Sequence, residues 1–311
     1  MTVRATVVIP THDHGSLLSR SIASACAQTI QDIEILVIGD GVPETVRDAV
    51  EGAVASDARV RLIDHPKGPR LGEKYRHQVL AAARGKIVCY LCDDDLWLDH
   101  HIEVMEDLLL SSDVAHALPV WVAPEGRIDV FAGDLADPRY RRELYQGQNF
   151  IPLSCFAHTM EAYRRLPEGW RTTPDSIPTD LYMYQQFLAQ SWCRAVSGWE
   201  PTVLHFPSPD RLDWTVERRG NELDAFSSRL ADLRWRRAYY AECIGLEGSD
   251  RARLQKDGDE DRAELARVKQ ELQGMAAQLA ALVRDHNAIG AELARVRAEN
   301  ADLHRDRDHI V

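Results

Sequence analysis

The chain has 311 residues and 45% of them are apolar, so it can bury a substantial core in one large domain or in two smaller ones. Its formal net charge of -12 separates it from the basic proteins that bind nucleic-acid backbones. The six cysteines are scattered, which is typical of a reducing compartment, and no apolar run approaches the roughly 20 residues that span a bilayer. We therefore expect a cytoplasmic protein without a transmembrane segment, either free or peripheral at the inner face of the membrane, and no nucleic-acid partner.

Four short apolar runs, rich in β-branched residues, predict buried parallel strands in the first part of the chain. The runs cover residues 5–9, 33–38, 60–63 and 87–91. Between the first two runs, and again between the last two, the segments 16–30 and 73–84 have apolar residues at helical spacing. Strands that alternate with helices predict a layered α/β fold, in which ligands bind beyond the carboxyl ends of the strands.

The next part of the chain is less regular. The segment 116–133 has two strand-like runs joined at Pro124-Glu125-Gly126, which predicts a hairpin. Residues 133–150 are polar and predict a loop, and a helix is expected to open at the sequence PTDLYMYQQFLAQ, which begins at Pro178. A helical extension is predicted over 216–247.

The composition changes near residue 248. A charged linker is predicted over 248–262, and a heptad repeat follows over 263–311. Its first core position holds Leu265, Leu272, Leu279, His286, Leu293 and Asn300, and its second holds Val268, Met275, Leu282, Ile289, Val296 and Leu303. Such a repeat predicts a C-terminal coiled-coil helix. The single Asn at a first position favours a parallel homodimer, whereas the many Leu residues there favour higher order; we predict the dimer.

Three consecutive aspartates, Asp93, Asp94 and Asp95, follow the fourth apolar run. Like charges repel, and carboxylates at the end of a buried strand are costly unless a cation or a hydrogen-bonding ligand meets them. The alternative is a solvated acidic turn that stabilises the N-terminus of the next helix. Because neighbouring residues of an extended strand point to opposite faces, the three carboxylates cannot serve one ion equally.

Two longer segments read VVIPTHDHGSLLSRSIASACAQTIQDIEILVIGDGVPE and GEKYRHQVLAAARGKIVCYLCDDDLW. The first has a strand that ends in Pro-Thr and a helix that closes in Ala-Gln-Thr, and the second has a strand that ends in the aspartates and Trp. Together they resemble family 2 glycosyltransferases of GT-A fold, closely over 3–110 and loosely over 150–206. The resemblance implies a GT-A domain over 1–215, built on a Rossmann-like mixed sheet flanked by helices, with a nucleotide-sugar half at 1–110 and an acceptor half at 111–215.

This resemblance implies an enzyme that moves one sugar from a nucleoside-diphosphate sugar to a hydroxyl of a glycan or another acceptor, with inversion at the anomeric carbon. A divalent cation, Mn²⁺ or Mg²⁺, would join the acidic protein to the donor phosphates, because carboxylate oxygens are the ligands that such ions prefer. By family position, Asp93 contacts the ribose and Asp94 or Asp95 reaches the metal. A late histidine, His205, is a further candidate ligand.

The resemblance also implies residues that line the nucleoside. Asp40 matches the acid that faces the nucleobase, where a carboxylate accepts the ring N–H of uracil or thymine, so a UDP- or dTDP-sugar is favoured. Gly39 stands where the family usually has a second acid. Arg76 matches an arginine that contacts the base or the diphosphate; a surface cation is the alternative. The other matches are Pro10, Thr11 and Asp13, for which an ordinary turn is the alternative.

An inverting transfer needs a carboxylate that takes the proton from the acceptor hydroxyl. The family keeps this base as an Asp that opens a helix in the acceptor half, and Asp180 matches it. The alternatives are the nearby Asp175 as base, or an Asp180 that only stabilises the helix N-terminus. His158 matches the turn before that helix and is expected to line the acceptor site, with core packing as the alternative.

Other features have simpler explanations. Cys89 and Cys92 have the spacing of metal ligands, but no second pair exists for zinc, so we expect core cysteines. His12 and His14 flank Asp13 like metal ligands, yet a polar loop explains them equally well. A second class of function stays open: a catalytically silent nucleotide-sugar-binding or scaffolding protein that oligomerises through its coiled coil.

Overall fold

The computed structural model describes residues 3–308, with their side chains except at 283, 285–288, 291, 293, 294 and 297–308. The chain forms two compact units, of which the first ends at Arg251 and the second begins at Ala252. Over the described residues, no helix combines the length and the apolar character that a bilayer crossing needs.

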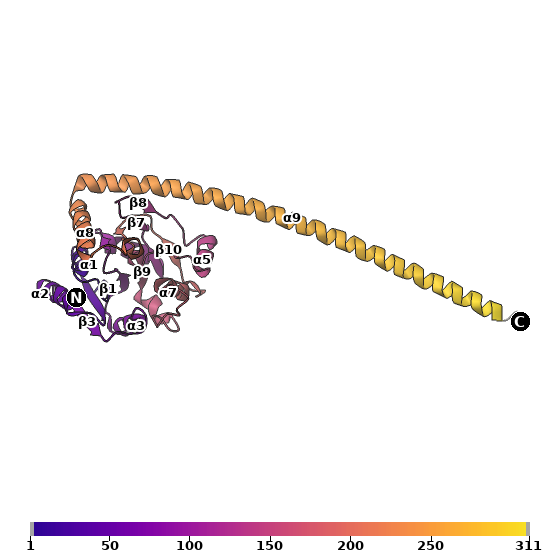
Figure 1. Ribbon diagram of the computed structural model, residues 1–311, viewed down its shortest axis with the longest axis horizontal. Helices are drawn as coiled ribbons and strands as arrows, with labels where there is room; N and C mark the ends of the chain where they lie inside the picture. Colours follow the sequence, from indigo (N-terminus) through magenta and orange to yellow (C-terminus); the bar gives the residue numbers. More distant parts are fainter. Residues whose placement is uncertain (1–2, 309–311) are drawn as a thin grey trace. The chain divides into compact units, whose positions relative to one another are not determined.

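A seven-stranded sheet lies at the centre of the first unit (Figure 1), in the order β10-β6-β9-β4-β1-β2-β3. Its strands are β1 (Ala5–Thr11), β2 (Ile33–Asp40), β3 (Val60–His65), β4 (Ile87–Tyr90), β6 (Val114–His116), β9 (Phe156–Thr159) and β10 (Ala195–Ser197). β9 runs antiparallel to β4 and β6, and the other neighbours pair in parallel. The predicted α/β fold with a mixed sheet is therefore confirmed.

Two small ribbons complete the strands. The ribbon of β7 (Val120–Val122) and β8 (Ile128–Val130) is antiparallel and confirms the predicted hairpin. The second ribbon pairs β5 (Leu96–Trp97), directly after the aspartates, with β11 (Val203–Leu204). This pairing brings residues near 205 next to the aspartates, although more than a hundred positions separate them in the sequence.

Helices flank the sheet (Figure 1). They are α1 (Leu17–Cys26), α2 (Glu44–Ser56), α3 (Glu73–Ala82), α4 (His101–Leu109), α5 (Pro138–Tyr145), α6 (Met160–Arg165), α7 (Thr179–Leu188) and α8 (Val216–Leu230), followed by α9 (Leu233–Asp308). The prediction of a loop over 133–150 is wrong, because α5 lies inside it. The Asp137 side chain caps α5 by accepting from the backbone N–H of Arg139, and Tyr140 and Leu144 are buried one turn apart.

Strand register determines which residues meet at the carboxyl ends of β1, β2 and β4. β1 pairs with β2 so that Thr11 lies opposite Gly39, and with β4 so that Val8 lies opposite Tyr90. The carboxyl ends of these parallel strands therefore meet at one edge. A core cluster that contains Leu17 of α1 and Leu223 of α8 packs α8 beside α1. The residues that follow the strands thus meet the start of α8.

The long helix α9 includes the charged segment 248–262. This segment was predicted as a linker but is helical. Its Arg, Leu, Gln, Lys and Ala residues favour a helix and offset its glycines and aspartates, and ion pairs such as Lys256–Glu260 at 3.7 Å add support. Farther along, the apolar heptad residues are exposed: Leu265, Val268, Leu272, Met275, Leu279, Leu282, Ile289 and Val296. The side chains of His286, Leu293, Asn300 and Leu303 lie outside the described residues. The coiled coil stays a prediction.

Candidate functional site

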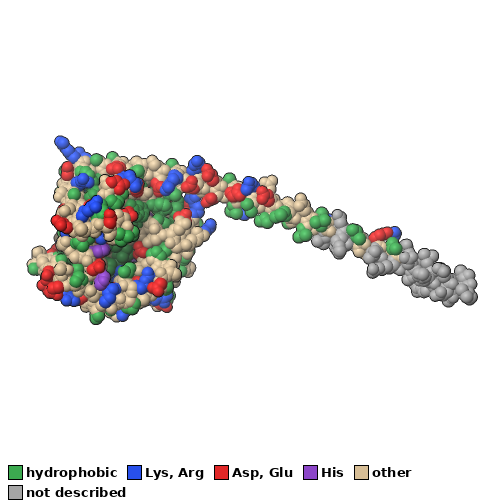
Figure 2. Space-filling view, in the orientation of Figure 1, with side chains coloured by type: hydrophobic (Ala, Val, Ile, Leu, Met, Phe, Trp, Pro, Cys, Tyr) green, Lys and Arg blue, Asp and Glu red, His purple; other side chains and the backbone are tan. Residues whose placement is uncertain are grey.

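A cavity of about 620 Å³ lies beyond the carboxyl ends of β1, β2 and β4. Figure 2 shows a hollow on one face of the unit where apolar, acidic and histidine side chains gather. The predicted site residues that line the cavity are Pro10, Thr11, Asp13, Asp40, Arg76, Asp93, Asp94 and Asp180. These residues come from both predicted halves of the domain, so the two halves share one site.

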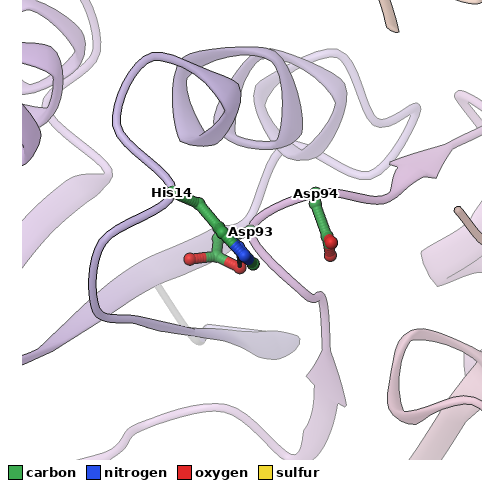
Figure 3. Close-up of side chains that lie close together, drawn as sticks. All are labelled: His14, Asp93 and Asp94. Atoms are coloured by element: carbon green, nitrogen blue, oxygen red, sulfur yellow. Dashed lines mark hydrogen bonds and ion pairs between the residues drawn. The ribbon is translucent and has the colours of Figure 1, made fainter. Parts of the chain in front are cut away.

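Asp93 is held by two side chains from the loop after β1. Thr11 Oγ1 donates to Asp93 Oδ2 at 2.6 Å, and His14 Nδ1 lies 2.7 Å from Oδ1 (Figure 3). The hydrogen bond to Asp93 raises the pKa of His14 to about 9, although burial opposes the shift. His14 therefore carries a proton at neutral pH and forms an ion pair with Asp93.

Asp94 lines the cavity and meets a cation from α8. Ser208 Oγ donates to Asp94 Oδ2 at 2.6 Å, and Arg219 Nη2 donates to the same oxygen at 2.5 Å. Burial, followed by the charges of Asp95 and Asp93, raises the pKa of Asp94 to about 6. A carboxylate in this position gains strongly from a positive partner.

Asp95 has no exposed surface and does not line the cavity. Ser154 Oγ and the backbone N–H of Phe206 donate to it at 2.5 and 2.9 Å, and His205 Nδ1 lies 3.0 Å from both carboxylate oxygens. Burial alone would raise the pKa of Asp95. The charge of His205 and the hydrogen bonds lower it by a larger amount, so the net pKa is below its usual range. Burial lowers the pKa of His205, but Asp95 raises it by more, and the two side chains form a close pair that joins β11 to the aspartate segment.

Each aspartate of the triplet thus has its own basic partner from a distant segment: His14 for Asp93, Arg219 for Asp94 and His205 for Asp95. Among the described residues, two groups also offer three metal-ligand atoms within 4.8 Å of one another. These groups are His14, Asp93 and Asp94, and Cys92, Asp94 and Asp95. Asp94 belongs to both groups, which makes it the aspartate best placed for a cation at the cavity wall.

At the other end of the cavity, Asp40 ends β2. Lys67 Nζ and the backbone N–H of Gly68 donate to its two carboxylate oxygens, each at 2.5 Å. Gly72 sits so close that a Cβ there would lie 2.6 Å from the Asp40 carboxyl carbon, and its φ of +63° also favours glycine. His12 Nδ1 donates to the Asp40 carbonyl at 2.7 Å. Lys67 was not predicted as a site residue, because in the sequence it belongs to a Pro-Lys-Gly turn that resembles any exposed turn.

Arg76 is 4% exposed and lies in the cavity wall, with its guanidinium 4.6 Å from the centre of the Trp170 ring. Within the described part of the chain, its Nε and Nη1 have no hydrogen-bond partner. Burial lowers the pKa of Arg76, and the charge of Glu73 opposes the shift. Buried donors without partners are costly, so these N–H groups point to a bound ligand with acceptor oxygens.

Asp180 lies in the first turn of α7 and lines the same cavity. The amide of Asn149 and the backbone N–H of Leu181 donate to it at 2.8 and 2.9 Å. Burial raises the pKa of Asp180 despite these bonds. The alternative base, Asp175, does not line the cavity and has a side chain that is 98% exposed.

Two predicted histidines lie elsewhere. His158 is fully buried in β9, where the hydroxyl of Tyr90 donates to Nε2 at 2.7 Å and Nδ1 donates to the Thr159 carbonyl at 2.9 Å. Burial lowers the pKa of His158 to about 4, so it is neutral. The prediction that His158 lines the acceptor site is wrong, because pairing of β9 with both β4 and β6 places it inside the sheet. His205 does not line the cavity either, since its Nδ1 faces Asp95.

Residues 6–168 match the sequence profile of glycosyl transferase family 2. An uncharacterized glycosyltransferase of Nostoc sp. is 29% identical over 191 residues, which are 56% of this chain and 57% of that protein. The succinoglycan biosynthesis protein ExoW of Rhizobium meliloti is 32% identical over 101 residues, which are 32% of each chain. The matched regions thus cover less than two thirds of these relatives.

Solved structures show the same fold. The crystal structure of S. aureus TarS residues 1–349 in complex with UDP-GlcNAc superposes with a TM-score of 0.51 at 15% identity. The superposition covers 66% of this chain and 58% of that one. At this identity the similarity concerns the fold alone, and it agrees with the mixed seven-stranded sheet described above.

Proposed function

Because the chain belongs to glycosyl transferase family 2, we propose that it is an inverting glycosyltransferase that moves one sugar from a nucleoside-diphosphate sugar to an acceptor hydroxyl. The observation that carries the proposal is that Asp40, Arg76, Asp94 and Asp180 line a single cavity. A nucleotide-binding scaffold needs the first two, whereas a carboxylate like Asp180, in the first turn of α7 and lining the same cavity, suits the transfer step. This residue therefore favours an enzyme over a silent binding protein.

The donor nucleoside would lie along the wall from Asp40 to Asp93. A carboxylate accepts the N–H of a uracil or thymine ring, and Lys67 beside it offers a donor to a ring oxygen. This pairing of one acceptor and one donor supports a UDP- or dTDP-sugar. Pro10, Thr11 and Asp13 line the same wall. The unpaired N–H groups of Arg76 would bind oxygens of the donor.

A divalent cation, Mn²⁺ or Mg²⁺, fits the residues at Asp94. The fit rests on a buried carboxylate at the cavity wall, with Asp93 close enough to offer a further ligand atom, whereas the protonated His14 stays paired with Asp93. When bound, the cation stabilises the negative charge that develops on the departing diphosphate. Asp95 and His205 would support this centre from behind, by holding the aspartate segment in place.

Asp180 would act as the general base. It takes the proton of the acceptor hydroxyl as the oxygen attacks the anomeric carbon, from the side opposite the leaving diphosphate. Burial raises its pKa, which brings a carboxylate closer to the range where it accepts a proton effectively. The Asn149 amide fixes the carboxylate orientation through its hydrogen bond.

A donor screen tests this function. The protein is incubated with UDP-, dTDP- and GDP-sugars in the presence of Mn²⁺, and the released nucleoside diphosphate is measured. We expect slow hydrolysis of a UDP- or dTDP-sugar by the wild-type protein and a faster release when a glycan acceptor is added. Tight binding of a donor without release, with every acceptor offered, would instead support the silent binding protein.

The exposed apolar stripe of α9 supports a homodimer through a parallel coiled coil. We predict that a protein truncated after Arg251 is a folded monomer that still hydrolyses its donor, and that the full chain is a dimer in light scattering. Gly274 and Gly290 cost roughly 1 kcal/mol each relative to Ala in a helix, so the coil should be of moderate stability. A full-length monomer at micromolar concentration, or a truncated protein that stays dimeric, would contradict this assignment.

A further inference from the structure

Arg219 contacts the aspartate segment from a part of the chain predicted to lie outside the catalytic domain. Its Nη2 donates to Asp94 Oδ2 at 2.5 Å and to Ser208 Oγ at 3.0 Å. Both acceptors line the cavity, and the side chains of Arg219 and Asp94 are 11% and 8% exposed. Arg219 does not itself line the cavity, but its guanidinium bonds two residues that do.

The backbone that carries Arg219 is firmly held. The guanidinium of Arg211 bonds both carboxylate oxygens of Glu222, at 2.6 and 2.7 Å, and the Val122 carbonyl at 2.9 Å, which joins the 207–211 turn to α8. On the other side, Arg20 of α1 forms an ion pair with Asp224. The helix is therefore a fixed support, and only the side chain of Arg219 needs to turn in order to change partner.

The negative charges at this wall of the cavity make a cationic side chain necessary for binding an anionic donor. A nucleoside diphosphate brings negative phosphates into a cavity whose wall already carries Asp93 and Asp94. An arginine offers planar N–H donors that match phosphate oxygens and stays protonated even when buried. A divalent cation at Asp94 would give this carboxylate a second positive partner, and the guanidinium of Arg219 would then be free to turn to the anion beside it.

We propose that Arg219 is a donor-binding residue that holds the diphosphate of the nucleotide sugar, and that its bond to Asp94 is the resting position of this group. The inference rests on the proposed function. It extends the donor site to α8, a helix that was predicted to lie outside the GT-A domain. Arg219 would contribute affinity for the phosphates and none for the nucleoside.

Calorimetric titration with UDP and with uridine, in saturating Mn²⁺, tests the inference without relying on activity. Arg219→Gln should lower the affinity for UDP by about tenfold to hundredfold, the scale of one or two charge-assisted hydrogen bonds, and leave that for uridine unchanged. Arg219→Lys should recover part of the loss. The matched control is Arg218→Gln, because Arg218 is exposed, stacks on Trp214 at 3.6 Å and carries the same charge on the same helix. Its affinities should equal those of the wild type.

The possible outcomes distinguish a failure of the Arg219 inference from a failure of the proposed function. If Arg219 only neutralises Asp94, then Arg219→Gln should bind Mn²⁺ more tightly and UDP as well as the wild type does, and the inference is overturned. An equal loss of affinity for UDP and uridine, with a lower melting temperature, would also overturn it, because the role would be structural. A wild-type protein that binds none of UDP, dTDP and GDP would contradict the proposed function itself.

Discussion

Asp180→Asn is expected to lower the rate of sugar transfer by about 100-fold or more, the usual contribution of a general base, while donor affinity stays close to that of the wild type. The amide keeps the shape of the side chain and its contact with the first turn of α7, but it cannot accept the proton of the acceptor hydroxyl. None of the proposed contacts to the donor phosphates is assigned to Asp180, so donor binding should be kept. Transfer assays and donor titrations on one preparation measure both quantities.

Asp175→Asn is the matched control, because this side chain is 98% exposed and lies only five residues away. It should transfer sugar at the wild-type rate. A normal rate in Asp180→Asn would instead place the base elsewhere in the cavity.

The pH profile gives an independent check of the same residue. Burial raises the pKa of Asp180, so the base is protonated and inactive below this raised value and active above it. Activity should therefore fall as the pH decreases, with a midpoint above the ordinary aspartate value of about 3.9. In the residual activity of Asp180→Asn the part of the acidic limb that belongs to Asp180 should disappear, whereas the loss that follows protonation of Asp94, whose pKa is about 6, should remain. A wild-type profile that stays flat down to the ordinary aspartate value would contradict the assignment.

Asp95→Ala is expected to lower the free energy of unfolding by about 3–5 kcal/mol, the cost of breaking a buried ion pair by removing one partner. The substitution leaves His205, the Ser154 hydroxyl and the Phe206 N–H without the carboxylate that they share. These groups connect β11, the aspartate segment and the turn before β9. Urea unfolding followed by circular dichroism measures the loss.

Asp95→Asn should cost less, because an amide oxygen still accepts from Ser154 and Phe206, and the remaining loss then reports on the ionic part of the pair with His205. Asp94→Asn is a further comparison. It should lower the free energy of unfolding much less than Asp95→Ala does, because Asp94 faces the cavity and its partner Arg219 can turn to water. A change below about 1 kcal/mol in Asp95→Ala, the range of surface pairs, would show that Asp95 is not a structural centre.

The meeting of Thr11, Asp40 and Asp93 at one edge of the sheet was predictable, because each position follows from a local pattern. Thr11, Asp40 and Asp93 each follow an apolar strand, and parallel strands bring their carboxyl ends to one edge, so the pattern alone places them together. The alternation of side chains along a strand predicted that the three aspartates could not serve one ion equally. In the structure Asp93 and Asp94 lie in a turn after β4 and both line the cavity, whereas Asp95 faces His205, so the division differs from strict alternation.

The partners of these residues could not be predicted, because they come from segments without a repeating pattern. Arg219 reaches Asp94 from α8 and Lys67 reaches Asp40 from a turn, and neither position differs from an ordinary surface cation in sequence. His158 was wrongly predicted to line the acceptor site, although the motif that contains it was recognised. Strand β9 pairs with β4 on one side and β6 on the other, and this pairing buries His158. Long-range packing decides these cases, and local sequence carries no information about it.

The most direct test of the donor site is the thermal stability of the full chain with UDP, measured with Mn²⁺ and with EDTA. We predict that UDP raises the melting temperature of the wild-type protein when Mn²⁺ is present and much less when EDTA replaces it. In Asp94→Asn the Mn²⁺-dependent part of this shift should vanish, while the melting temperature without nucleotide changes little. An equal UDP shift in EDTA and in Mn²⁺, or an unaltered Mn²⁺ response in Asp94→Asn, would contradict a donor site built on a cation at Asp94.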